Sequence, residues 1–196
     1  MVAYVFDSII TKGVKAGQVP GRTVDARNWF RNAASRSARA GAQTLISKNS
    51  QKQVSDVGIG EMALFVYDAK TKAKLPYFDK YPLIFKLEDY GDSFLGMNVH
   101  YLPPRLRARL MDALYDTATN QRYDDSTRLR INYKILAGAA KYNAFKPCVK
   151  KYLRSQMRST MIKIDSVEWD IALFLPIAQF SGAGKNKVYG DSRKMV

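Results

Sequence analysis

The sequence predicts an α+β fold: a small antiparallel sheet or partly closed barrel, flanked by an N-terminal arm with a long helix and by a C-terminal helical region. Three observations predict it. Apolar residues alternate along short segments of residues 59–102. The pair Pro103-Pro104 is followed by apolar residues at helical spacing. The third observation is a stretch after Thr23 that is rich in Ala and Arg and contains no proline, which is typical of a helix.

The N-terminal arm, residues 1–58, is expected to begin with a short strand from Val2 to Phe6. Glycines and a proline then favour irregular backbone. Thr23 is a good helix N-cap, so we expect a long helix from there to about Ser47. Its apolar stripe is thin and made mostly of alanine, so this helix needs a partner to cover it. A polar linker follows it.

The sheet module is expected at residues 59–102. The segment 62–67 is apolar on both sides, which predicts a strand with both faces at least partly covered. Two further strands, residues 81–87 and 94–102, flank the charged turn 88–92. These strands predict an antiparallel sheet.

The helical region is expected at residues 103–180. One helix begins at about Pro104, a second is capped by Ser126 or Thr127, and a third, short helix runs from Pro147 to about Met157. A strand over residues 160–164 and a turn of helix capped by Ser166 complete it. Residues 181–196 are expected to form an exposed, flexible tail, because Gly, Ser, Lys and Asp dominate there.

Composition excludes several classes of protein. The 196 residues, 46% of them hydrophobic, suit one domain and exclude wholesale disorder. A single cysteine, Cys148, excludes a disulfide framework and a Cys-cluster zinc site. No apolar run is long enough to span a bilayer, and the N-terminus does not resemble a signal peptide.

No catalytic motif, metal site or cofactor site is expected. The tail sequence around Gly184-Lys185 lacks the first glycine and the hydroxyl residue of a phosphate-binding loop. Acidic residues in 68–92 are explained better as turn residues that offset lysines than as ligands of a nuclease metal ion. His100, the one histidine, is expected to be structural and hydrogen-bonded. Cys148 is expected to be a plain thiol, with a pKa depressed by neighbouring lysines.

The net charge of +15 is divided unevenly along the chain. Residues 1–58 hold nine basic and three acidic side chains (+6), residues 59–102 hold five and six (−1), and residues 103–196 hold eighteen and eight (+10). Six basic residues, and no acid, lie between positions 141 and 158. The like charges of such a cluster repel one another unless a polyanion is near, and the phosphates of DNA are the natural polyanion.

Eight residues are therefore predicted to contact double-stranded DNA. Four of them follow one another at every fourth position and share a face of the expected third helix: Lys146, Lys150, Arg154 and Arg158. Lys151 and Lys141 lie beside them, and Arg27 and Arg31 of the N-terminal helix join the set. Binding through phosphates would be sensitive to salt and independent of sequence. A solvated face or an acidic partner protein is the alternative, and a membrane surface is disfavoured.

Aromatic residues of the near-neutral sheet module suit docking into a ring of other proteins, because aromatic side chains are enriched at interfaces. This predicted docking set is Tyr77, Phe78, Tyr81, Tyr90, Phe94 and Tyr101.

Several runs of the sequence resemble one protein family. They are LPYFDKYPLIF (75–85), FLGMNVHYLPP (94–104), RARLMDALY (107–115) and EWDIALFLP (168–176), with TKG and AGQVPGRT near the N-terminus. The chain resembles virion-associated proteins of T-even-type tailed bacteriophages, and the DNA end protector type fits best. Baseplate, tail-hub and neck proteins are the competing types.

The resemblance implies a non-enzymatic structural component of a tailed-phage virion, at or near the head–tail connection, that contacts packaged DNA and completes the head. Implied partners are portal or neck proteins in multiple copies, and the implied locations are the host cytoplasm for synthesis and then the virion. The alternative is a baseplate or tail-hub component whose basic faces contact acidic neighbours. A packaging nuclease is a weaker third hypothesis.

Overall fold

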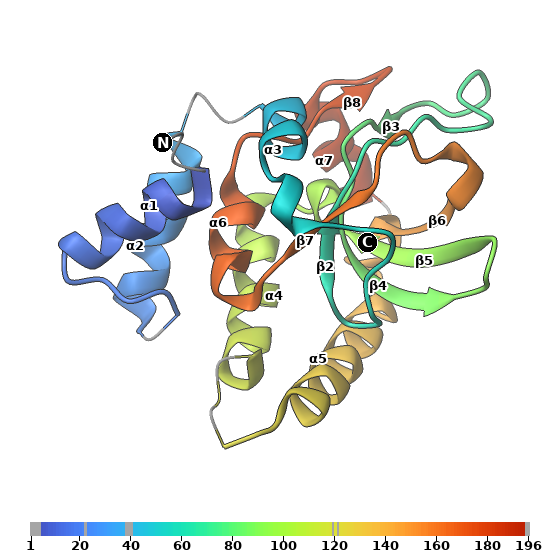
Figure 1. The fold of residues 1–196 in the computed structure, drawn as a ribbon. Coiled ribbons are helices and arrows are strands. Elements are labelled where there is room, and N and C mark those ends of the chain that lie inside the picture. Colours follow the sequence, from blue (N-terminus) through green and yellow to red (C-terminus); the bar gives the residue numbers. More distant parts are fainter. Residues whose placement is uncertain (1–4, 22, 38–40, 119, 121, 195–196) are drawn as a thin grey trace.

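The computed structural model describes residues 5–21, 23–37, 41–118, 120 and 122–194. It confirms the α+β class, and its main sheet is open and not closed into a barrel (Figure 1). This sheet has six antiparallel strands in the order β1-β7-β2-β4-β5-β6, and a second sheet pairs β3 with β8. The main sheet thus takes β1 from before residue 59 and two strands from after residue 102.

The strands of the main sheet are short. They are β1 (Gln53–Val54), β2 (Met62–Leu64), β4 (Leu83–Asp89), β5 (Ser93–Asn98), β6 (Val149–Leu153) and β7 (Met161–Ile164). The small sheet consists of β3 (Phe78–Asp79) and β8 (Phe180–Ser181). β4 and β5 form the expected hairpin, with a register shift between Lys86 and Glu88. β5 ends at Asn98, earlier than expected, because the Asn98 side chain accepts a hydrogen bond from the His100 N–H and the chain turns into a 3-10 helix.

Helices cover one face of the main sheet, and loops cover the other. Phe85 points to the helical side and packs edge-on against Trp169, with ring centroids 4.9 Å apart. Its neighbour Ile84 points to the opposite side, where Phe65, Phe94 and Tyr152 form a smaller aromatic cluster. Both faces of β2 are therefore buried, as the continuous apolar run predicts.

The helices are α1 (Val5–Lys15), α2 (Val24–Ser35), α3 (Ala42–Lys48), α4 (Pro104–Ala118), α5 (Asp125–Ala140), α6 (Trp169–Phe174) and α7 (Lys185–Lys194). Short 3-10 turns occupy residues 50–52, 99–101, 146–148, 154–156 and 166–168. α4 begins at the predicted proline. α5 is capped by Asp124, not by Ser126 or Thr127, and Asp165 caps the turn before α6 in a capping box with Glu168. Among the described residues, no helix is long and apolar enough to cross a bilayer.

Two N-terminal predictions were wrong. The segment expected as a strand ends inside α1, since Phe6 and Ile9 bury one helical face; Val2 lies outside the described residues. Gly13 lets α1 approach α2, because a Cβ there would lie 2.3 Å from the Phe30 ring. The long helix predicted after Thr23 is two helices. Thr23 caps the N-terminus of α2, as expected. However, α2 ends at Ser35, and α3 starts after Gly41.

Two C-terminal predictions were also wrong. The third helix expected from Pro147 is the strand β6, which pairs along the edge of β5 and buries Tyr152 against Phe94. Here sheet pairing outweighs the helical spacing of the charges. The expected flexible tail forms β8 and then α7, whose Val188 and Ser192 are buried.

Candidate nucleic-acid interface

Because residues 149–153 form a strand and not the predicted helix, the predicted basic face is arranged differently. In β6, Lys150 and Lys151 point to opposite sides, because side chains alternate along a strand. Lys146 is exposed in the 3-10 turn before β6, and Arg154 lies in the 3-10 turn after β6. The four residues at every fourth position therefore do not share a face.

Lys150 and Lys151 each lie over an aromatic ring. The Lys150 Nζ is 4.5 Å from the centroid of Tyr101, and its side chain is half-buried. Burial lowers the pKa of Lys150. Lys151 is exposed, and its Nζ is 5.3 Å from the centroid of Tyr90. Among the described residues, no carboxylate forms an ion pair with either ammonium group, so both charges are available to an anion.

Arg154 and Arg158 are different, because acidic residues already neutralise them. The Arg154 Nη2 lies 2.8 Å from an oxygen of Asp56 and 2.8 Å from one of Asp89. Lys86 shares the same two carboxylates from the buried side. Hydrogen bonds from Lys86 and from the Gly91 N–H lower the pKa of Asp89 to about 2. Arg158, at the surface, lies 3.7 Å from Asp68.

Arg27 and Arg31 lie elsewhere, between α2, α4 and α6. Arg31 is only 8% exposed, and its Nε donates to Asp170 at 2.6 Å while its Nη2 donates to Asp112 at 2.7 Å. Arg27 lies over the ring of Tyr115, 5.0 Å from its centroid. These arginines hold α2 against the body of the molecule, and Arg31 has no exposed charge to offer DNA.

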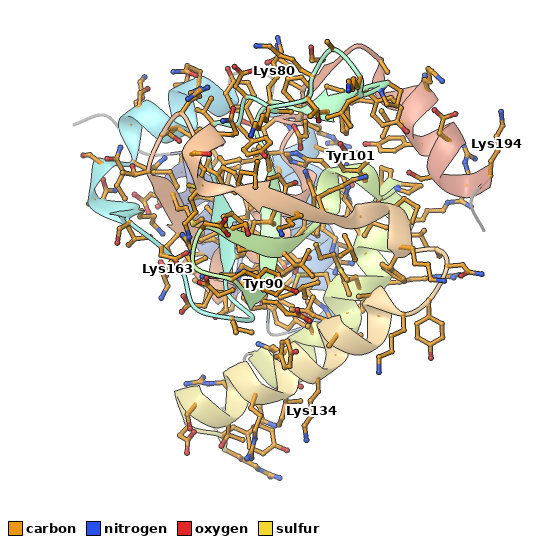
Figure 2. All side chains as sticks on the ribbon, turned by 90° about the vertical axis from the view of Figure 1, so that its right-hand side faces the viewer. Lys80, Tyr90, Tyr101, Lys134, Lys163 and Lys194 are labelled. Atoms are coloured by element: carbon orange, nitrogen blue, oxygen red, sulfur yellow. The ribbon has the colours of Figure 1, made fainter. Side chains whose placement is uncertain are left out.

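A basic stripe runs along α5 to its C-cap residue, and it contains Lys141, which was predicted to contact DNA, and two residues that were not, Arg130 and Lys134. Arg130, Lys134 and Lys141 are exposed, and their separations of four and seven residues bring them to one side of the helix. Figure 2 labels Lys134 on this helix, which projects below the sheet. No acidic partner of these three side chains occurs among the described residues. The spacing of Arg130 and Lys134 in the sequence is a sufficient signal for this stripe. We call these residues the α5 stripe.

The stripe and β6 are joined by a short segment that carries Lys146. Tyr142, in this segment, is 70% exposed. Figure 1 shows α5 and β6 on the side of the molecule away from α1 and α2. Of the eight residues predicted to contact DNA, the structure thus leaves Lys141, Lys146, Lys150 and Lys151 without acidic partners within the described residues. All four belong to the continuous segment 141–151.

The predicted docking aromatics divide in a similar way. Phe94 is fully buried and Tyr101 is 4% exposed, so both are core residues and do not form a free surface. Tyr77, Phe78 and Tyr81 are partly buried. Tyr90 is 52% exposed and donates its hydroxyl to Glu88.

A pocket of about 360 Å³ lies between β6 and the segment 67–79. Five aromatic side chains line it, and three lysines surround them. The aromatic residues are Tyr67, Tyr77, Phe78, Tyr101 and Tyr152, and the lysines are Lys70, Lys150 and Lys151. Asp79 is the one carboxylate among its lining residues.

The two residues considered for chemistry are structural. His100 is buried and hydrogen-bonded to Asp79, as predicted. Cys148 is buried, and burial raises its pKa to about 12, so the expectation that lysines depress this pKa was wrong. Within the described part of the chain, no group of three or more His, Cys, Asp or Glu side chains could hold a metal ion.

A family model described as the phage T4 terminal DNA protecting protein matches residues 14–195. No curated protein and no solved structure matches the chain.

Proposed function

Because the chain belongs to the family of phage T4 terminal DNA protecting proteins, we propose that it is a non-enzymatic virion component that covers the end of packaged double-stranded DNA. The proposed place is at or near the head–tail connection, after synthesis in the host cytoplasm. There the protein would complete the head with portal or neck proteins as neighbours.

The single observation that carries the proposal is the run of unpaired cations from the α5 stripe to β6. Arg130, Lys134, Lys141, Lys146 and Lys151 are all exposed. None of them forms an ion pair with a carboxylate of the described residues. Like charges in one run repel each other, and a duplex backbone relieves that repulsion while it releases counterions. The contacts would be to phosphates, which position a protein without reading sequence.

Protection needs no chemistry by the protein. A protein held on the terminal phosphates excludes an exonuclease by occupying the place where that enzyme must bind. This account fits the buried, structurally engaged His100 and the buried thiol of Cys148, neither of which is exposed to a substrate.

Exposed aromatic and apolar side chains supply a proposed surface for virion neighbours. Tyr90 and Leu75 are 52% and 42% exposed, and partly exposed Tyr77 lies close to the latter along the chain. The alternative, a baseplate or tail-hub component, uses the same surfaces with acidic proteins in place of DNA.

The test is protection of linear duplex DNA from an exonuclease, together with binding measured over a series of salt concentrations. We expect protection at low salt and an affinity that falls steeply with added salt, with no preference for sequence. Absence of binding at low salt, or binding unchanged by salt, would overturn the proposal. DNA cleavage by the protein with Mg²⁺ present would contradict its non-enzymatic part.

A further inference from the structure

The pocket between β6 and the segment 67–79 has the composition of a nucleotide site. Its walls are aromatic: the Tyr77 and Tyr101 rings are tilted by 34° with centroids 6.2 Å apart, and the Tyr67 and Tyr152 rings meet edge-on at 5.0 Å. Aromatic side chains of this kind stack on nucleobases of any sequence, because every base has a π-face.

The charge of the pocket favours an anion. Three lysines line it, and the side chain of one of them, Lys150, lies over the lining ring of Tyr101, whereas the side chain of Lys151 points to the other side of β6. Lys150 is held over Tyr101 and has no carboxylate partner among the described residues. The only acid in the lining, Asp79, is engaged from behind by two hydrogen-bonding partners. Its Oδ2 lies 2.7 Å from the His100 Nδ1 and accepts from the Asn98 amide at 3.0 Å.

The volume matches one small ligand. About 360 Å³ lies at the lower end of the range of pockets that bind small molecules, and it leaves no room for a stacked duplex. A base that enters must therefore leave its stack. Extruding an internal base costs a few kcal/mol in lost pairing and stacking, whereas an unpaired base at a strand end costs least.

We propose that this pocket takes the terminal nucleotide of a DNA strand, with its base against Tyr77 and its phosphate on Lys150. The proposal rests on the proposed function and deepens it. The α5 stripe would bind duplex phosphates without regard to position, and the pocket would distinguish an end from the interior of the duplex.

The experiment compares competition by linear DNA and by covalently closed circular DNA of the same sequence. The full chain is incubated with a labelled linear duplex that carries a short single-stranded overhang. At equal concentrations of base pairs, we expect the linear competitor to displace the labelled duplex about tenfold more strongly than the circle does. Lys150→Gln and, separately, Tyr77→Leu should remove this preference, and Tyr77→Leu should leave binding to the circle within about twofold of wild type.

Two further variants complete the design. Lys150→Arg keeps the cation and should retain the end preference, and Lys134→Gln of the α5 stripe should weaken linear and circular DNA equally. Thermal unfolding curves show whether each variant is folded, and Tyr77→Leu tests the pocket independently if Lys150→Gln is unstable. If both folded pocket variants keep the preference for DNA ends, the proposal that the pocket binds the terminal nucleotide is overturned and the proposed function is not. Failure of wild type to bind either DNA would overturn both.

Discussion

The Nδ1 atom of His100 lies 2.7 Å from the Oδ2 atom of Asp79, and neither side chain is exposed to solvent. Asn98 donates its amide to the same carboxylate oxygen and also to the hydroxyl of Tyr152. The network joins β3, β5 and β6 behind the lysine-lined pocket. The small sheet is thus fixed to the main one by buried polar contacts.

This buried pair predicts a dependence of stability on pH. Complete burial lowers the pKa of His100, by more than the neighbouring carboxylate raises it. In the unfolded chain the imidazole should titrate near its usual value of about 6.5. Below that pH the unfolded state takes up a proton that the folded state does not. The free energy of unfolding should therefore be constant above about pH 7 and fall at lower pH, by at most about 1.4 kcal/mol per pH unit.

Urea unfolding between pH 5 and pH 8 measures this effect, in a range where most carboxylates stay ionised. The chain has one histidine, so His100→Gln should remove most of the slope. Stability that rises in wild type as the pH falls from 7 to 5 would mean that the folded histidine is protonated, and it would contradict the prediction.

Arg31 is predicted to stabilise the fold and to play no part in DNA binding. Arg31→Gln leaves the carboxylate of Asp170 buried without its cation, and breaking a buried pair typically costs about 3–5 kcal/mol. The half-exposed Asp112 makes the weaker contact, so Asp112→Asn should cost about 1 kcal/mol or less. Chemical denaturation gives both numbers.

DNA affinity of Arg31→Gln, measured at a temperature where it is folded, should stay within about twofold of wild type. A loss as large as that of a phosphate-contacting lysine would show that Arg31 acts in binding as well as in folding.

The fold could be predicted where local pattern and tertiary context agree. The β4–β5 hairpin, α4 after Pro104 and the Thr23 cap follow from short-range signals. β6 could not be predicted in this way, because its lysines and arginines repeat at helical spacing while its backbone is held by the free edge of β5. The α2–α3 break was not predicted either: α2 ends at Ser35, and Gly41 has extended backbone at the start of α3.

The candidate site was half predictable for a related reason. Charge density draws attention to residues 141–158, but it does not show which cations already have partners. Arg154 is paired with Asp56, 98 positions away, and Arg31 with Asp170, 139 positions away. Such long-range pairs appear only when the chain is folded. The pocket forms between the segment 67–79 and β6, which are far apart in the sequence, so it could not be predicted from the sequence for the same reason.

Cys148 is predicted to be unreactive in the folded protein. Burial raises its pKa to about 12, and the side chain is fully enclosed. At pH 8 the thiolate fraction and the access of reagent are both small, so the reaction with a disulfide reagent such as DTNB should be at least about a thousandfold slower than in urea. Absorbance of the released thiolate follows the rate. Rapid labelling without denaturant would show that the segment around Cys148 opens readily.

The α5 stripe is predicted to supply much of the salt-dependent affinity. Replacing Arg130, Lys134 and Lys141 by Gln should weaken binding to duplex DNA at low salt and reduce the slope of log K against log salt by about 0.9 for each lost phosphate contact. The matched control replaces three exposed lysines of α1 and α3: Lys12, Lys15 and Lys48. It removes the same net charge from helices that lie away from α5 and β6 (Figure 1).

If general charge attraction alone drove binding, the two triple variants would lose affinity equally. We expect the stripe variant to lose at least about ten times more than the control, because only direct phosphate contacts release counterions in full. Fluorescence anisotropy with a labelled duplex at several salt concentrations measures both slopes. Equal slopes in the two variants would place the DNA on another surface.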